Sequence, residues 1–282
     1  MPFANTNGVR AGTGDCEAMV KRVVTGVVAG AGFLVLLTIG GWAFAALLAV
    51  LALAGYAEFA GLNGGSARQP EVWAGFAATL ALAVPKWPFG WTATEPQTMM
   101  WLLAFVLLAA TVIRQNRFHL EHAALLALGA LYIGFGFRAM ALVREAEHGL
   151  FWSALAFVCV WATDTGAYFT GRAAGKRKLW PAISPNKTVE GAIGGLAAAV
   201  AAALVFAAFR PELLGVGHAV AFGLAAGVAG QLGDLIQSAY KRLRGVKDSG
   251  RLLPGHGGVL DRTDSWLIAF PLLQVLALLP GA

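Results

Sequence analysis

Long apolar stretches, separated by short polar loops, occupy most of this 282-residue chain. A membrane-spanning helix needs roughly 20 mainly apolar residues, so the pattern predicts an all-α, polytopic integral membrane protein with about nine transmembrane helices. Gly40-Gly41 divides the first two candidate spans as a turn, and the third span is short. The candidate spans lie at about 23–40, 42–62, 72–86, 98–113, 123–143, 151–170, 188–209, 214–237 and 264–280.

The chain divides into a polar N-terminal tail, residues 1–22, and a single transmembrane domain, residues 23–282. Within that domain the N-terminal half is expected to be a scaffold, and residues 160–265 the catalytic region. The first apolar stretch is too long for a signal peptide and has no clear cleavage site, so it is expected to remain as a helix. No long internal repeat and no soluble domain are visible.

Composition supports the membrane interpretation, because 58% of the residues are hydrophobic and only 13% are charged. A soluble domain has roughly 25% charged residues. The net charge of +6 is spread over short loops between apolar spans. Such a distribution favours attraction to anionic lipid or an anionic substrate, and it argues against nucleic acid as a partner.

The distribution of Lys and Arg predicts the orientation of the chain, since cytoplasmic loops are enriched in these residues. Most of the 21 basic residues lie in the N-terminal tail or in the loops that follow even-numbered spans. The exceptions are Lys86, Arg138, Arg144 and Arg210. We therefore expect a cytoplasmic N-terminus and cytoplasmic loops after the even-numbered spans.

Two pairs of glycines recur at four-residue spacing, Gly26/Gly30 and Gly223/Gly227. Small residues at this spacing let helix backbones approach closely. Packing within one chain is the favoured interpretation, and contact in a homodimer is the alternative.

Two carboxylates interrupt apolar spans, and both are expected near the cytoplasmic ends of their helices. Asp164 lies in the sixth span and Asp234 in the eighth. A charged side chain within a membrane span is costly and marks a candidate functional site. Equal depth on the same side would let the two side chains meet in one site.

The loop after the sixth span combines small residues, hydroxyl groups and cations, a mixture that suits an anion. Ser184, Asn186 and Lys187, next to Pro185, are candidate ligands there, and the following helix directs its positive dipole end to the same face. Arg177 and Lys178 are better explained as basic residues that fix the topology.

The loop after the eighth span is denser in polar residues than any other segment. Basic residues can bind phosphates, glycines allow close backbone approach, and carboxylates supply the oxygen ligands that Mg²⁺ prefers. Together they indicate a phosphoryl- or nucleotidyl-transfer site. The residues are Ser238, Lys241-Arg242, Lys247-Asp248, His256-Gly257-Gly258 and Asp261-Arg262-Thr263-Asp264.

This string closely resembles the motif of the phosphatidate cytidylyltransferases, also called CDP-diacylglycerol synthases. The motif has a Ser, a Lys-Arg pair, a Lys-Asp pair, His-Gly-Gly and a final Asp-Arg-x-Asp, and each part has a counterpart here. The one departure is Tyr240, where the family usually has an aliphatic residue, Met or Phe. The resemblance also includes Asp164 to Gly175 and Ser184 to Gly191, so it covers roughly the C-terminal half.

The resemblance implies transfer of CMP from CTP to phosphatidic acid in a bacterial cytoplasmic (inner) membrane, with the active site facing the cytoplasm. It implies Mg²⁺ as cofactor and admits a second, monovalent cation such as K⁺. Carried over by position, the metal ligands are Asp234 and Asp261, to which Asp164 is added because of its expected position. Phosphate-binding and hydrogen-bonding roles go to Lys241, Arg242, Lys247, Arg262, Ser238 and Ser184, and supporting roles in cation binding to Asp248 and Asp264.

Three interpretations stay open at this stage. His256 is either a proton shuttle or a residue that orders its loop. Glu58, near the end of the second span, faces either the site or the lipid headgroups. His119 and His122 fit a polar patch at the membrane surface better than a metal site.

Two rival functions belong to other classes. A CTP-dependent kinase of a lipid alcohol would share the nucleotide contacts but release CDP rather than pyrophosphate. An ion-coupled transporter would use Asp164 and Asp234 as coupling sites. The full motif argues against the kinase, while the one-sided clustering of polar loops and the lack of an inverted repeat argue against the transporter.

Overall fold

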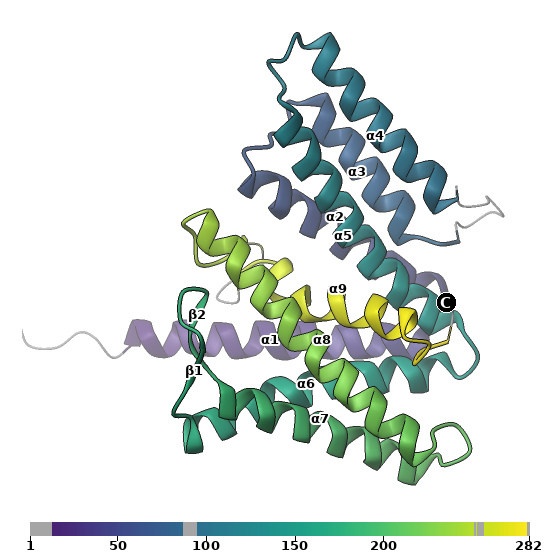
Figure 1. The fold of residues 1–282 in the computed structure, drawn as a ribbon, viewed down its shortest axis with the longest axis vertical. Helices are drawn as coiled ribbons and strands as arrows, with labels where there is room; N and C mark the ends of the chain where they lie inside the picture. The colour runs from purple at the N-terminus through teal and green to yellow at the C-terminus, as the bar shows by residue number, and fades with distance from the viewer. Residues whose placement is uncertain (1–12, 87–94, 251, 253–256, 281–282) are drawn as a thin grey trace, which may run out of the picture.

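The computed structural model describes residues 13–86, 95–250, 252 and 257–280. These parts of the chain form a predominantly helical bundle that carries one small β-hairpin (Figure 1). The first helices are α1 (Thr13–Ile39), α2 (Gly41–Leu62), α3 (Pro70–Ala83), α4 (Pro96–Ile113) and α5 (Leu120–Glu145). The later elements are α6 (Gly149–Ala174), β1 (Lys178–Trp180), β2 (Ser184–Thr188), α7 (Val189–Phe209), α8 (Val216–Leu243) and α9 (Leu260–Val275).

A helix occupies each of the nine positions where a span is expected. Within the described parts of the chain, six of these helices are long and apolar enough to cross a membrane, namely α2, α4, α5, α6, α7 and α8. The others are shorter: α3 has 14 residues, α9 has 16, and the apolar part of α1 is Val24–Ile39. The chain is therefore an integral membrane protein, and the number of nine spans stays a prediction.

The ends of two helices differ from the expected ones. Helix α1 begins at Thr13, inside the segment expected to be a polar tail, because residues 13–22 include good helix formers such as Glu17, Ala18 and Met19. Helix α9 begins earlier than the expected span and ends at Val275, since Ala277 adopts a left-handed backbone conformation with φ of 55°.

A β-hairpin corrects the all-α prediction. Strands β1 and β2 pair in antiparallel register, with Trp180 opposite Ser184 and Lys178 opposite Thr188. The segment is polar and lies between two helices, so it has none of the helical apolar periodicity that identified the spans. Thr188 ends β2 and also caps α7, because its Oγ1 accepts a hydrogen bond of 3.1 Å from the Gly191 N–H.

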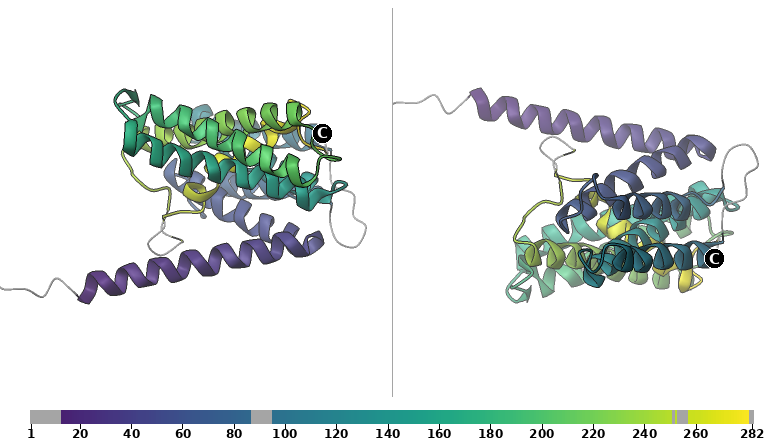
Figure 2. Two further views of the ribbon diagram at one scale, coloured as in Figure 1. Left: turned by 90° about the horizontal axis from the view of Figure 1, so that it is seen from below. Right: turned by 90° about the horizontal axis from the view of Figure 1, so that it is seen from above.

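Helix α1 runs along one edge of the bundle (Figure 2). It turns into α2 at Gly40 and Gly41, both with positive φ, as expected for a turn. Arg144 of α5 holds this turn, donating from Nε to the Leu37 carbonyl at 2.7 Å and from Nη2 to the Thr38 carbonyl at 3.0 Å. Arg144 thus satisfies the last carbonyls of α1.

Aromatic and small residues make the helical core close-packed. The rings of Phe33, Phe157 and Trp266 lie 4.9 to 5.2 Å apart and join α1, α6 and α9. A Cβ on Gly223 would come within 2.6 Å of Val200 Cα, so this glycine is needed for packing of α8 on α7 within one chain. A Cβ on Gly30 would meet nothing within 4 Å, so packing within this chain does not require that glycine. Contact of the Gly26/Gly30 pair in a homodimer stays a prediction.

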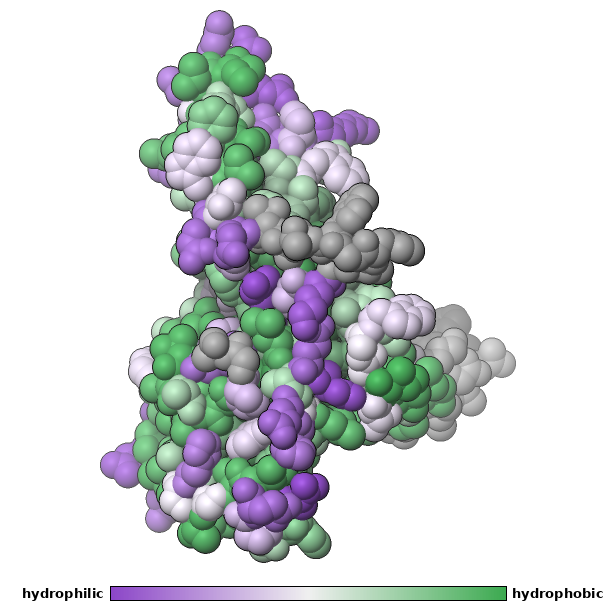
Figure 3. All heavy atoms as spheres, turned by 90° about the vertical axis from the view of Figure 1, so that its right-hand side faces the viewer, coloured by the Kyte–Doolittle hydropathy of each residue, from purple (hydrophilic) through white to green (hydrophobic). Residues whose placement is uncertain are grey.

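The polar elements gather at one end of the bundle. The β-hairpin, the C-terminal end of α8 and the start of α9 lie toward the left of Figure 1, and the C-terminus lies toward the right. The second half of α8 contains Asp234, and the start of α9 contains the last motif residues, so these residues belong to the hairpin end of the molecule. The opposite, right-hand side of Figure 1 shows hydrophilic residues between hydrophobic ones (Figure 3).

Candidate active site

Helices α6 and α8 bring the two intramembrane carboxylates to one cavity. The cavity has a volume of about 500 Å³, and Asp164 of α6 and Asp234 of α8 both line it. Strand β2 contributes Asn186 and Lys187 to the same wall. Three segments that are distant in the sequence thus supply acidic, amide and basic groups to one space.

Asp234 is held by a cation and a hydroxyl group. Lys187 Nζ lies 2.5 Å from Asp234 Oδ2. Ser238, one turn further along α8, donates from Oγ to Asp234 Oδ1 at 3.2 Å. Both side chains of the ion pair are partly exposed, so cations and anions from solution can compete with it.

Contacts from both sides place the hairpin, and therefore Lys187, against α8. Glu190, in the first turn of α7, accepts hydrogen bonds from the backbone N–H groups of Lys176 and Arg177, each at 3.1 Å. Arg242 of α8 donates from Nε to the Ile183 carbonyl at 3.4 Å. A carboxylate at a helix N-terminus is also favoured by the helix dipole.

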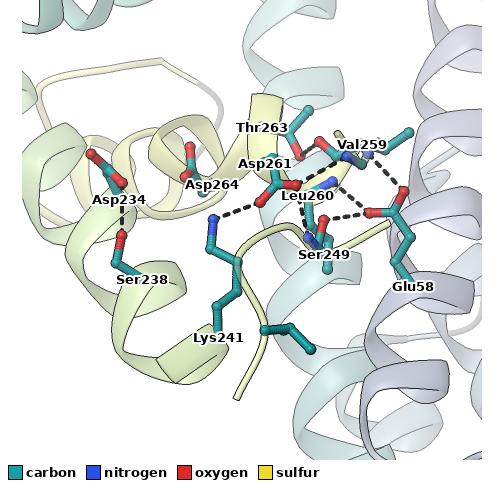
Figure 4. Close-up of polar contacts among 12 residues, drawn as sticks. Glu58, Asp234, Ser238, Lys241, Ser249, Val259, Leu260, Asp261, Thr263 and Asp264 are labelled. Atoms are coloured by element: carbon teal, nitrogen blue, oxygen red, sulfur yellow. Dashed lines mark hydrogen bonds and ion pairs between the residues drawn. The ribbon is translucent and has the colours of Figure 1, made fainter. Parts of the chain in front are cut away.

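Asp261 has a full set of donors (Figure 4). Lys241 Nζ lies 2.6 Å from Asp261 Oδ1, and the Ser249 and Gly258 N–H groups donate to Oδ2 at 2.8 and 3.0 Å. The Lys241 and Asp261 side chains are only 12% and 6% exposed. This pair therefore fixes the loop between α8 and α9 to the end of α8.

Glu58 of α2 holds the same loop from the other side (Figure 4). Its Oε1 accepts from the Val259 N–H at 2.8 Å, and its Oε2 accepts from the Leu260 N–H at 3.0 Å and from Ser249 Oγ at 2.8 Å. Two of these donors are the free N–H groups at the start of α9. Of the two alternatives left open for Glu58, the structure favours the one in which it faces the site.

The two glycines of the motif leave the space that the Asp261 and Glu58 carboxylates occupy. Gly257 has a φ of +83°, and a Cβ there would come within 2.7 Å of Asp261 Oδ2. A Cβ on Gly258 would collide with Ser249 Oγ and with the Glu58 carboxylate. Because the Gly258 N–H already donates to Asp261, this glycine orders the loop instead of presenting a free donor to a ligand.

Asp264 lies between Asp234 and Asp261 in the view of Figure 4. It is buried, and its Oδ1 accepts from the Ser265 N–H at 2.7 Å. Its charge interacts with those of Asp234, Asp164 and Lys241. Asp264 therefore lies near the Asp164 and Asp234 side of the site, although it is not among the residues that line the cavity.

The other predicted residues are less closely gathered. Lys247, Asp248 and Arg262 are exposed at the end of the bundle. Ser184 pairs with Trp180 at the far end of β2 and does not line the cavity, while Asn186 does. His256 lies outside the described residues.

Ser249 was missed in the sequence analysis. It is buried and contributes two donors, its N–H to Asp261 and its hydroxyl to Glu58. A single serine in a loop has no distinguishing sequence pattern. Its role depends on Glu58 of α2, which lies close to it only in the folded structure. Glu58 did have one, because it is a carboxylate near the end of an apolar span.

The donors present suit a metal ion that arrives with phosphate groups. Among the described residues, no three His, Cys, Asp or Glu side chains form a group that could hold a metal, which also applies to His119 and His122. Mg²⁺ usually takes one or two carboxylates and completes its shell with water and substrate phosphates. Asp164 and Asp234, which line one cavity, fit that arrangement. Asp234 and Asp261 already bind a cationic group each, the ammonium groups of Lys187 and Lys241.

Comparisons with known proteins identify relatives of this chain. The sequence profile described as the Cytidylyltransferase family matches residues 20–279. A phosphatidate cytidylyltransferase of Staphylococcus haemolyticus is 38% identical over 259 residues, covering 92% of this chain and 98% of the relative. One from Staphylococcus aureus is 37% identical with the same coverage, and one from Staphylococcus saprophyticus is 43% identical over 70% of this chain and 75% of the relative. The chain therefore belongs to the cytidylyltransferase family.

Proposed function

We propose that this protein transfers CMP from CTP to phosphatidic acid, which yields CDP-diacylglycerol and pyrophosphate. The observation that carries the proposal is the cavity between α6 and α8, where Asp164, Asp234 and Lys187 meet beside the motif loop. Relatives named phosphatidate cytidylyltransferase match this chain over 92% of its length. The protein is accordingly a nucleotidyltransferase of phospholipid biosynthesis.

The reaction needs positioning and charge neutralisation more than covalent chemistry from the protein. An oxygen of the phosphatidate phosphate attacks the α-phosphorus of CTP, and the bond from that phosphorus to the oxygen bridging to the β-phosphate breaks. Pyrophosphate leaves with the electron pair of that bond. Because the attacking phosphate is already ionised near neutral pH, no protein nucleophile is required.

Phosphate binding is assigned first to Lys187 and Lys241. Lys187 bonds Asp234 in a partly exposed pair, so its ammonium group can exchange that partner for a phosphate oxygen. The more buried Lys241 would use a further N–H of its ammonium group for a phosphate while it keeps its bond to Asp261. Arg242, Lys247 and Arg262 supply further positive charge at the exposed end of the same loop. Asn186 in the cavity and Ser238 beside Asp234 would donate further hydrogen bonds, with Ser184 further along the hairpin.

Asp164, Asp234 and Asp261 are the proposed holders of Mg²⁺, assisted by Asp248 and Asp264. When bound, the metal would offset the negative charge that develops on the leaving group. The metal must share Asp261 with Lys241, because both oxygens of that carboxylate have donors in this structure. A second, monovalent cation such as K⁺ would bind carboxylate oxygens of these five aspartates that Mg²⁺ does not use. His256 would serve as a proton shuttle or order its loop.

The proposed location is the bacterial cytoplasmic membrane, with nine spans, a cytoplasmic N-terminus and the site facing the cytoplasm. Two arguments support it. The loops that follow even-numbered helices carry most of the Lys and Arg residues, and the hairpin and the end of α8 lie together at one end of the bundle. CTP would enter from that end, and phosphatidic acid would enter laterally with its acyl chains in the bilayer.

The test is an assay of purified protein with CTP labelled in the α-phosphate, phosphatidic acid and Mg²⁺. We expect labelled CDP-diacylglycerol and an equal amount of pyrophosphate. Release of CDP with a phosphorylated lipid would support the lipid-alcohol kinase instead. Folded protein that forms neither product, but moves ions across vesicle membranes, would support the transporter.

Asp234→Asn isolates the proposed metal and phosphate site. We expect activity to fall by at least about a hundredfold, as for loss of a charged group that acts in the transition state. Asp234 is partly exposed, so the variant should remain folded. Activity close to that of the unaltered chain would contradict the role of Asp234 but not the assigned reaction.

A further inference from the structure

A second cavity lies at the same end of the bundle but shares no lining residue with the first. It has a volume of about 210 Å³ and forms where α2 ends, α3 begins, and α4 connects to α5. The polar residues in its wall include Asn63, Glu71, Arg114, Arg117 and His122. None of them is part of the motif or of the proposed mechanism.

The charges in this cavity favour an anion. Glu71, only 5% exposed, fixes Arg114 through a contact of 2.9 Å between its Oε1 and Nε. Among the described residues, the terminal nitrogens of Arg114 and the side chain of Arg117 have no hydrogen-bond partner and no further ion pair. Two arginines against one carboxylate leave net positive charge and several free N–H donors, which suit a phosphate group.

An unpaired buried atom shows that the wall needs a polar neighbour. Glu71 Oε2 is buried and has no hydrogen-bond partner in the part of the chain that the structure describes. Leaving a buried carboxylate oxygen without a partner costs free energy, so native structures usually supply one. A hydroxyl group of a lipid headgroup or a water bound in the cavity, either of which can donate a hydrogen bond, would meet that requirement.

Asn63, another residue of the cavity wall, is held in place by α8. Asn63 donates from Nδ2 to the Tyr240 hydroxyl, and Arg244 donates to Asn63 Oδ1. The Tyr240 ring also stacks on Phe59 with centroids 4.9 Å apart. The cavity is therefore preorganised by side-chain contacts, and Tyr240, the one departure from the family motif, helps to form its frame.

The surroundings of the cavity match the depth of lipid headgroups. The exposed ring of Trp73 lies on the first turn of α3, and its Nε1 donates to the Ala67 carbonyl. Tryptophan prefers the interface between headgroups and hydrocarbon. Basic pockets between transmembrane helices at this depth bind the headgroups of anionic lipids.

We propose that this second cavity binds the phosphate of an anionic phospholipid of the surrounding bilayer, at a site separate from the one that binds the reacting phosphatidic acid. Arg114 and Arg117 contact the phosphate, while His122 and Glu71 contact polar groups of the headgroup. The site gives the protein an affinity for anionic lipid that does not depend on its reaction.

The test uses phosphatidylglycerol, which is not a proposed substrate, as the probe. The full-length protein in detergent micelles is titrated with phosphatidylglycerol, and the thermal unfolding midpoint is measured. We expect the unaltered chain to be stabilised. Arg117→Gln should raise the apparent dissociation constant about tenfold, the effect of losing a charge-assisted hydrogen bond.

Arg68→Gln is the matched control, because it removes the same charge from an exposed position on the neighbouring loop that does not line the cavity. It should change the dissociation constant by less than about twofold. Equal losses in Arg68→Gln and Arg117→Gln would overturn the proposal, since they would indicate attraction by general surface charge.

Two further measurements keep the outcome decisive. Arg117→Lys keeps the charge but not the planar fork, so it should bind better than Arg117→Gln and worse than the unaltered chain. Inorganic phosphate is titrated in parallel, and stabilisation by free phosphate equal to that by phosphatidylglycerol would overturn the assignment to a lipid. Unchanged phosphatidylglycerol binding in a folded Arg117→Gln variant would overturn the site itself.

Discussion

Two lysine–carboxylate pairs dominate the site, and their burial differs in a way that decides how each responds to mutation. The Lys187–Asp234 pair is partly exposed to the cavity, whereas the Lys241 and Asp261 side chains are almost fully buried. Breaking a buried pair leaves an uncompensated charge, which costs about 3–5 kcal/mol. An exposed pair is worth about 0–1 kcal/mol. The first pair is thus free to exchange partners, and the second also stabilises the fold.

Lys241→Gln should therefore lower both stability and activity. We expect the free energy of unfolding to fall by about 3 kcal/mol, because Asp261 keeps its charge without its cation. The double variant Lys241→Gln with Asp261→Asn should recover part of that loss. Arg177→Gln, at the exposed Arg177–Glu190 pair, is the control and should cost less than about 1 kcal/mol in the same denaturation measurement. Equal losses in the two single variants would contradict the structural role of Lys241.

Glu58 offers a second test at this scale. Glu58→Gln keeps the shape of the side chain but retains one acceptor oxygen for three donors, and it turns an NH₂ group toward a backbone N–H. We expect kcat to fall by about tenfold or more, with a smaller change in KM for CTP, because the motif loop loses its anchor. Glu147→Gln, at a fully exposed glutamate, should leave both constants unchanged. A Glu58→Gln enzyme with normal kcat would show that the loop is ordered without this carboxylate.

At the scale of elements, the loop between α8 and α9 depends on glycine for two different reasons. Gly245 and Gly257 both have positive φ, but a Cβ on Gly245 would meet nothing within 4 Å, whereas one on Gly257 would press on Asp261. Gly245→Ala should therefore cost only about 1 kcal/mol of backbone strain. Gly257→Ala should cost more and should also reduce kcat, because it displaces the Asp261 carboxylate. Measurement of unfolding and kcat for both variants separates strain from displacement, and similar results for the two would contradict the proposed contact.

The apolar pattern predicted the helices well and the loops poorly, for a physical reason. Burial in lipid or in a helical core imposes a long apolar run, which is visible in sequence, so helices appear at all nine expected positions. The β-hairpin and the Ser249 contacts depend on backbone groups and on partners far away in the chain. Ser249 reaches Glu58 across 191 positions, and no local pattern records such a contact.

The same limit applies to the site. The motif and the intramembrane carboxylates indicated the residues, and the structure brings Asp164, Asp234 and Lys187 to one cavity. It also separates Ser184 from that cavity and engages both oxygens of Asp261. These side-chain contacts depend on how α6, α8 and α9 pack against one another. A sequence motif gives the residues but not this packing.

For the whole molecule, the proposed topology predicts which ends of the helices face the cytoplasm. Cys159 is buried and should not react, so after Cys16→Ser, single cysteines can be introduced at chosen loops. Arg210 follows α7, and Arg177 follows α6, so the two exposed positions lie on opposite sides if α7 crosses the membrane once. We expect Arg210→Cys to react with a membrane-impermeant maleimide in intact cells, and Arg177→Cys to react only after permeabilisation. The reverse pattern would place the active site outside the cytoplasm, where CTP is not supplied, and would contradict the proposed orientation.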